Sequence, residues 1–244
     1  MTPLTLLCLP YSGASAMVYS RWRRKLPEWI KLQPVELPGR GARYGEPLHT
    51  DMRRLALQLA HEQKAMLKAP YALFGHSLGA LLACEMAHAF RSLGVAEPVA
   101  LFASGTAAPT MRLEYDRGFA EPKTDAELIE QLRSLNGTRE EVLANQELMS
   151  LTLPILRADF QLCGRFEPIQ RPLLKCPVHV LGGKADRATT EQLIGWSKET
   201  HGSFSLDMLA GGHFFIHEHE AKVLKVIKDQ LDVHHRRHAM AVTA

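Results

Sequence analysis

A serine flanked at two positions by glycines offers the first sign of chemistry. Gly75-His76-Ser77-Leu78-Gly79 has the spacing of a nucleophile elbow, a tight strand-to-helix turn that presents a serine hydroxyl. The apolar run Tyr71–Phe74 predicts a strand before it, and the pattern over 80–93 predicts a helix after it. Side chains two residues to either side of the serine would collide in such a turn. We therefore predict Ser77 as a nucleophile; the alternative is a strand–turn–helix with an incidental serine.

A serine hydroxyl is a weak nucleophile at neutral pH and needs a general base. In this architecture an acid and then a histidine follow the serine along the chain. His213 lies in Gly211-Gly212-His213-Phe214-Phe215, between a predicted strand at 204–209 and the last predicted helix, so it should lie at the carboxyl edge of the sheet. His217 and His219 would begin that helix and are expected on the surface. We expect His76 to pack beside the turn.

The acid that orients the histidine should also follow a strand. Asp186 lies in Gly182-Gly183-Lys184-Ala185-Asp186-Arg187, directly after the apolar run 178–181. Its competitors are Asp159, inside a helical pattern, and Asp207, inside a predicted strand. We choose Asp186 on topology; the alternative is a turn residue that supports the next helix.

The tetrahedral intermediate of acyl transfer needs two N–H donors. The residue after the nucleophile, Leu78, should supply one from its backbone. The turn Pro10-Tyr11-Ser12-Gly13-Ala14 follows the first apolar run and could supply the other from Tyr11 or Ser12. A turn with no catalytic role is the alternative there.

These residues require a framework of strands and helices to bring them together. Apolar runs at 4–9, 35–37, 71–74, 99–103, 178–181 and 204–209 alternate with helical patterns at 52–67, 80–93 and 217–233. Strands that are apolar on both faces predict a mostly parallel α/β sheet covered by helices on both sides. The stretch from about 111 to 172 contains no convincing strand, and capping boxes at 124–127 and 138–141 predict inserted helices. We interpret it as a lid within a single domain of residues 1–244; packing decoration is the alternative.

Composition narrows the classes of function. The 244 residues are 46% hydrophobic and 23% charged, which is typical of a globular chain. A net charge of +3 is too small to indicate nucleic acid on its own, so we expect no nucleic-acid partner. We see neither an apolar run of about 18 residues nor a secretory signal. The four cysteines form no CxxC pair and indicate a reduced, cytoplasmic protein. Neither HExxH nor a complete GxGxxG occurs, so we expect no metal and no dinucleotide. The basic tail 234–238 is expected to be a solvated terminal segment.

Together these motifs resemble type II thioesterases, the discrete α/β-hydrolases that accompany nonribosomal peptide and polyketide synthases. The resemblance covers nearly the whole chain. Its landmarks, besides the elbow, are Cys8-Leu9-Pro10-Tyr11-Ser12-Gly13, Leu37-Pro38-Gly39-Arg40-Gly41, Leu153-Pro154 with Arg157-Ala158-Asp159, Pro177-Val178-His179-Val180 and Gly211-Gly212-His213-Phe214-Phe215.

The resemblance implies an α/β-hydrolase fold with a helical lid over a pocket for an acyl group and a phosphopantetheine arm. It implies a triad of Ser77, Asp186 and His213, with Leu78 and Ser12 as the oxyanion donors. The reaction would be hydrolysis of acyl groups from carrier-protein thioesters, without any cofactor of the enzyme's own, because the arm belongs to the substrate. The chain would act as a monomer, our default.

Carrier proteins are usually acidic, so a basic rim is expected in or beside the lid, drawn from Arg112, Arg117, Lys123, Arg133, Arg165 and Arg171. Two other functions stay open. A small-molecule esterase or acyl-CoA thioesterase could use the same fold. A carrier-binding protein without catalysis is the third possibility, and the complete set of candidate catalytic residues argues against it.

Overall fold

The computed structural model describes residues 3–67, 70–112, 114–135 and 137–242, so positions 1–2, 68–69, 113, 136 and 243–244 of the expected domain and lid lie outside it. The described residues form a six-stranded sheet in the order β2-β1-β3-β4-β5-β6, and every neighbouring pair is parallel. The strands are β1 (Leu4–Leu9), β2 (Ile30–Pro34), β3 (Tyr71–His76), β4 (Leu101–Ser104), β5 (Val178–Gly183) and β6 (Phe204–Leu209). The predicted parallel sheet is therefore confirmed.

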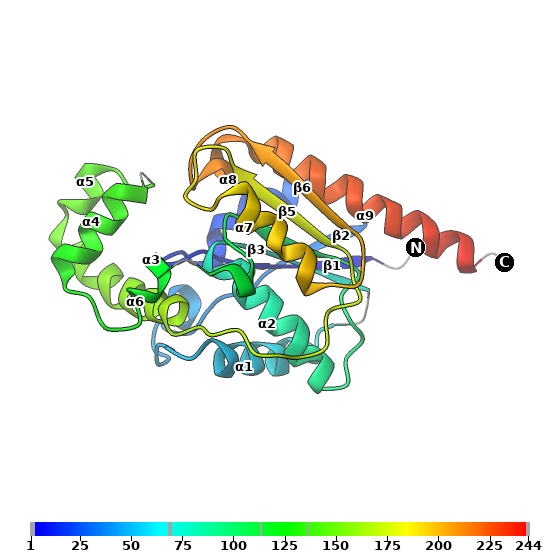
Figure 1. Cartoon of the computed structure of the whole chain (residues 1–244), viewed down its shortest axis with the longest axis horizontal. Helices are drawn as coiled ribbons and strands as arrows, with labels where there is room; N and C mark the ends of the chain where they lie inside the picture. The colour runs from blue at the N-terminus through cyan, green and yellow to red at the C-terminus, as the bar shows by residue number, and fades with distance from the viewer. Residues whose placement is uncertain (1–2, 68–69, 113, 136, 243–244) are drawn as a thin grey trace.

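Both faces of the sheet are buried, which explains why its strands are apolar along their whole length. Leu7 and Leu9 of β1 point into a core shared with α1 (Met52–Lys64) and α2 (Leu78–Ser92). Leu6 and Cys8 point into the opposite core, which α9 (Glu220–Val242) covers. Figure 1 shows α1 and α2 below the sheet and α9 above it. The first core also receives α7 (Thr190–Ile194), and the second receives α8 (Phe215–Glu218).

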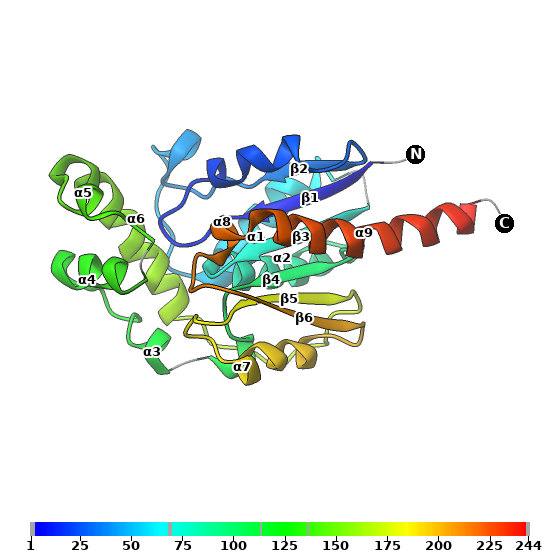
Figure 2. The same ribbon diagram turned by 90° about the horizontal axis from the view of Figure 1, so that it is seen from above.

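The expected insertion is helical. It contains α3 (Glu114–Arg117), α4 (Asp125–Leu135), α5 (Glu140–Leu143) and α6 (Gln146–Gly164), all between β4 and β5. Both views place α4, α5 and α6 beyond the end of the sheet opposite the two chain termini (Figures 1 and 2). The parallel strands run toward that end, so the inserted helices lie beside their carboxyl ends. Shorter 3₁₀ segments are η1 (Ala16–Arg24), η2 (Gly41–Arg43), η3 (Pro109–Met111) and η4 (Gly195–Glu199).

One of the two predicted capping boxes is confirmed. Thr124 Oγ1 accepts from the N–H of Glu127, and Glu127 Oε2 accepts from the N–H of Thr124 at 2.7 Å. The box at 138–141 is wrong, because α5 begins one residue too late for Thr138 to be its N-cap. Arg139 takes that position and makes no side-chain capping bond.

The second strand was predicted in the wrong place. β2 occupies 30–34 rather than 35–37, and it buries Ile30 and Leu32 while Lys31 is exposed. Because β2 is an edge strand, it alternates instead of forming the continuous apolar run that we sought. The last helix also differs: α9 continues past the expected end at Val233 to Val242, so the basic tail is helical. In the described part of the chain, no helix has the length and apolar character needed to cross a bilayer.

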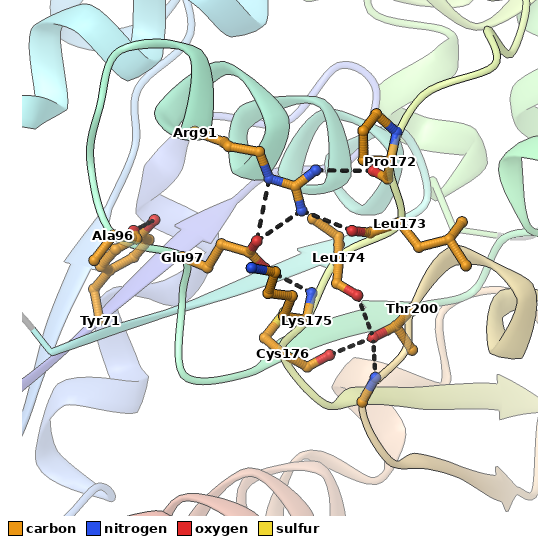
Figure 3. Close-up of polar contacts among 11 residues, drawn as sticks. Tyr71, Arg91, Ala96, Glu97, Pro172, Leu173, Leu174, Lys175, Cys176 and Thr200 are labelled. Atoms are coloured by element: carbon orange, nitrogen blue, oxygen red, sulfur yellow. Dashed lines mark hydrogen bonds and ion pairs between the residues drawn. The ribbon is translucent and has the colours of Figure 1, made fainter.

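The segment that leads from α6 back to β5 is fastened to the body of the protein (Figure 3). Arg91 near the end of α2 donates to the carbonyl oxygens of Pro172 and Leu173, both at 2.8 Å, and pairs with Glu97 at 2.7 Å. Glu97 in turn accepts from the N–H of Lys175 at 2.6 Å. The insertion is therefore anchored at its C-terminal junction, close to the start of β5.

Candidate active site

Ser77 occupies the elbow that the sequence predicts. It is the N-cap of α2 and, among the described residues, the one non-glycine with positive φ, at φ 55° and ψ −119°. The two glycines are required by close backbone contacts. A Cβ on Gly75 would lie 2.0 Å from the carbonyl oxygen of Gly79, and one on Gly79 would lie 2.2 Å from that of Leu9. The strained backbone is held by packing against β1, as expected for a functional turn.

Asp186 and His213 come together from the ends of β5 and β6. His213 Nδ1 lies 3.0 Å from Asp186 Oδ2 and 3.1 Å from Oδ1. The aspartate side chain is 4% exposed and the histidine side chain 14%, so water competes little for this contact. The N–H of Arg187 donates to Asp186 Oδ1 at 2.7 Å and fixes the carboxylate. Asp159 lies elsewhere, fully buried against Arg40.

A cavity of about 80 Å³ joins these groups. Its lining includes Ser77, Asp186, His213 and Ser12, together with residues of the inserted helices such as Phe160. The loops after the strands thus supply the candidate catalytic groups, and the insertion covers them with both apolar and polar side chains. Two further residues of α6 and α4, Cys163 and Gln131, complete part of that cover, and Arg187 Nη2 donates to Ser134 Oγ of α4 at 2.8 Å.

The two candidate oxyanion donors come from different segments, the start of α2 and the turn after β1. Leu78 is the first residue of α2, where backbone N–H groups have no partner within the helix. Ser12 lies in the turn after β1, which is closed by a hydrogen bond from the N–H of Ala14 to the carbonyl of Tyr11 at 3.0 Å. Gly13 has φ +78° there. These features describe a type II turn with Ser12 and Gly13 at its corners.

Of the two neighbouring histidines, His76 packs in the core and His217 lies at the surface. His76 is fully buried, its Nδ1 lies 2.9 Å from Ser104 Oγ, and its ring centre lies 5.0 Å from that of His213. Burial, and to a smaller extent the charge of His213, holds the pKa of His76 well below its ordinary value. His217 is exposed, as expected, but its Nε2 lies 3.0 Å from the hydroxyl of Tyr11. Sequence reasoning gave no sign of that contact, which ties the turn after β1 to α8.

Two members of the expected basic rim do not lie at the surface as expected. The side chain of Arg112 is 4% exposed and pairs with Asp116 at 3.4 Å, while Arg171 pairs with the buried Glu85. Both guanidinium groups therefore serve internal contacts rather than a rim. The sequence did not reveal these internal positions, because Arg112 also donates to the carbonyl oxygen of Cys163 and Arg171 pairs with Glu85, and both partners lie far along the chain.

The described side chains favour neither a cysteine nucleophile at the cavity nor a metal site. Burial raises the pKa of the Cys163 thiol to about 12, so this cysteine stays protonated and unreactive. Among the residues that the structure describes, no group of three or more His, Cys, Asp or Glu side chains could hold a metal ion.

Comparisons with known proteins bear on the chain as a whole. A family model described as "Thioesterase domain" matches residues 4–231. Gramicidin S biosynthesis protein GrsT of Aneurinibacillus migulanus is 37% identical, over 93% of this chain and 89% of that protein. Two solved structures are also similar: RedJ, a thioesterase from the prodiginine pathway of Streptomyces coelicolor, with 35% identity and a TM-score of 0.87, and the type II thioesterase BorB from the borrelidin cluster, with 37% identity and a TM-score of 0.84. The two matches cover 94% of this chain and 91% and 93% of the respective structures.

Proposed function

The chain belongs to the thioesterase family, and from that premise we propose that it is an editing type II thioesterase. It hydrolyses acyl groups from the phosphopantetheine arms of carrier proteins in nonribosomal peptide or polyketide synthesis. The observation that carries the proposal is the contact between His213 and Asp186 at a cavity that also contains the strained Ser77. Relatives that are named for gramicidin S and prodiginine biosynthesis support the substrate class.

The roles in the triad follow from the hydrogen bonds. Asp186 accepts from His213 Nδ1, which leaves Nε2 without a hydrogen and able to take a proton. His213 Nε2 removes the proton of Ser77 as its Oγ bonds to the thioester carbonyl carbon. The carbonyl oxygen becomes an oxyanion, which the N–H groups of Leu78 and Ser12 stabilise.

Collapse of this intermediate breaks the C–S bond. The imidazolium of His213 returns its proton to the leaving thiolate, so the carrier regains a free thiol and the acyl group stays on Ser77 as an ester. Water then gives a proton to His213, and its oxygen attacks the ester carbonyl in the same oxyanion hole. The proton passes back to Ser77 as the acid is released, and the enzyme returns to its starting state.

The inserted helices α3–α6 act as the lid in this proposal. A cavity of about 80 Å³ is small beside the roughly 300 Å³ or more of a typical ligand pocket. An acyl group with its pantetheine arm therefore needs these helices to move outward. The monomeric state, the single domain over 1–244, the cytoplasmic location and the independence from cofactors stay predictions from the sequence.

The decisive experiment compares three substrates that carry the same acetyl group. Acetyl release is measured from an acetyl-phosphopantetheinyl carrier protein, from acetyl-pantetheine and from acetyl-CoA, with the wild type and with Ser77→Ala. We expect release that requires Ser77 and strongly favours the carrier. Equal or faster hydrolysis of the free thioesters would instead identify a small-molecule thioesterase on the same site, and full activity of a folded Ser77→Ala would remove the mechanism altogether.

A further inference from the structure

A buried ion pair lies against the turn that holds Ser12. Asp159 of α6 is fully buried, and its two carboxylate oxygens accept from Arg40 Nη1 at 2.6 Å and Nη2 at 2.7 Å. The same Oδ2 accepts from the backbone N–H of Gly13 at 2.8 Å. Arg40 also reaches the carbonyl oxygen of Ala14 at 3.5 Å. The pair therefore holds the central peptide and the last residue of the type II turn.

α6 also makes a hydrophobic contact with the same turn. Leu156 lies one helical turn before Asp159, and its Cδ2 lies only 2.7 Å from where a Cβ on Gly13 would stand. Position 13 thus requires glycine for two separate reasons, the positive φ and the close approach of Leu156. α6 supplies packing and a charge-assisted hydrogen bond to one peptide unit, the one that follows Ser12.

The same helix lines the cavity. Phe160, next to Asp159, and Cys163, one turn further, both face the space that Ser77 and Ser12 share. Any displacement of α6 by an entering acyl group must therefore move the carboxylate that holds Gly13. The Ser12 N–H belongs to the peptide plane before Ser12, and the φ and ψ of Ser12 in the type II turn link that plane to the next one, which Asp159 holds.

We propose that Asp159 and Arg40 are positioning residues that aim the Ser12 N–H at the oxyanion, so that the lid helix α6 sets the geometry of the oxyanion hole. The inference rests on the proposed function, because it needs Ser77 to form an oxyanion. It gives a role to the Arg40 turn and to Asp159, two sequence landmarks that the triad leaves unused. Neither residue touches the substrate in this role.

The test needs variants that keep the protein folded, because removing one partner leaves a buried unpaired charge. Arg40→Met with Asp159→Leu removes both charges and the acceptor for Gly13. Arg40→Met with Asp159→Asn removes the charges but keeps an oxygen for the Gly13 N–H. The matched control is Arg171→Met with Glu85→Leu. It removes a second bidentate ion pair, whose hydrogen bonds are 2.5 and 2.8 Å long and whose glutamate is 3% exposed. Neither of these residues belongs to the turn of Ser12.

The readouts are kcat and KM on an acetyl-loaded carrier protein and the rate of Ser77 labelling by a fluorophosphonate, whose phosphoryl oxygen occupies the oxyanion hole. For the leucine variant we expect both kcat and labelling to fall about 10²-fold, the effect of losing one oxyanion donor. KM should stay within about threefold, since the pair does not contact the substrate. We expect the asparagine variant to stay within about fivefold of the wild type and the control within about threefold.

A folded leucine variant with unchanged kcat and labelling would overturn the proposal. So would an asparagine variant as slow as the leucine variant, or an equal loss in the control. Should the leucine variant not fold, hydrogen exchange in the wild type decides. We expect the amide of Gly13 to open together with residues 156–163 of α6, and independent opening would refute the coupling.

Ser12→Pro separates this inference from the proposed function. Proline is favoured at that corner of a type II turn, so the loop keeps its shape while the N–H is lost. A fall in kcat with Ser12→Pro but none with the leucine variant would refute only the positioning role. No fall with Ser12→Pro would remove Ser12 as a donor, and a wild type that neither hydrolyses the carrier thioester nor labels at Ser77 would refute the proposed function.

Discussion

Asp186→Asn is the substitution whose effect the geometry defines most closely. In the wild type, Asp186 Oδ1 accepts from the N–H of Arg187 at 2.7 Å, while His213 Nδ1 lies 3.0 Å from Oδ2 and 3.1 Å from Oδ1. An asparagine keeps its oxygen toward Arg187, because only an acceptor fits there. Its amide NH₂ then takes the place of Oδ2 and points its hydrogens at Nδ1.

This orientation of the asparagine changes which ring nitrogen of His213 carries the proton. Nδ1 must become an acceptor, so the ring proton moves to Nε2, and Nε2 can no longer take the proton of Ser77. The wrong tautomer of a catalytic histidine costs about 10⁴ in kcat, which corresponds to about 5.5 kcal/mol of activation free energy. Shape and packing are unchanged, so we expect the melting temperature to stay within a few degrees of the wild type.

The assay is release of acetate from an acetyl-loaded carrier protein, followed by intact-protein mass spectrometry of the carrier. Asp207→Asn is the matched control, since it makes the same change on β6, at the other aspartate near this edge of the sheet, and should stay within about threefold. A folded Asp186→Asn that retains more than a tenth of the wild-type kcat would refute the assignment of Asp186 as the acid.

Three further predictions concern the elbow and the buried histidine of β5. Ser77→Gly and Ser77→Ala should both lose turnover, but only the glycine variant should be more stable than the wild type, by about 1 kcal/mol in thermal or urea unfolding, because it relieves the positive φ. Gly79→Ala, whose Cβ would lie 2.2 Å from a backbone oxygen of β1, should lose about 3 kcal/mol or more in the same measurement, whereas Gly45→Ala, with nothing within 4 Å, should change stability by about 0.5 kcal/mol at most. Burial lowers the pKa of His179 from 6.5 to about 4, so between these values only the unfolded chain binds the proton, and stability falls as the pH drops below about 6.5. Urea titrations at pH 7 and pH 5 should show that His179→Asn reduces this loss by about 2 kcal/mol, and an equal loss in both proteins would contradict the burial argument.

The elbow could be predicted because its constraints are local. Gly75, Ser77 and Gly79 lie within five residues, and the conflict between a Cβ on Gly75 and the backbone of Gly79 arises inside the turn itself. The conflict at Gly79, by contrast, is with Leu9 of β1 and depends on the tertiary structure. The strands could be predicted almost as well, because a sheet buried on both faces makes them apolar throughout. β2 was not predicted because it lies at the edge of the sheet, where only alternate residues are buried and no continuous apolar run forms.

The contact between Asp186 and His213 could be predicted from the sequence only in part. The sequence placed each after a strand, and parallel strands bring their carboxyl ends to one edge. This topology narrowed the choice of acid to Asp186, but the 3.0 Å contact itself came from the register of β5 against β6. Arg112 and Arg171 show the opposite case, because Arg112 donates to the carbonyl oxygen of Cys163 and Arg171 pairs with Glu85, contacts that depend on how α6 and the segment after it pack.

By itself the sequence determined the parallel α/β architecture, the elbow and the chain order of the candidate triad, since short-range sterics and strand burial specify them. Only the tertiary structure decided that Asp159 and Arg40, 119 residues apart, meet beneath the turn of Ser12. No local pattern marks that contact. It exists because α6 packs across the carboxyl edge of the sheet, where burial removes water and leaves the two charges and the N–H of Gly13 as one another's partners.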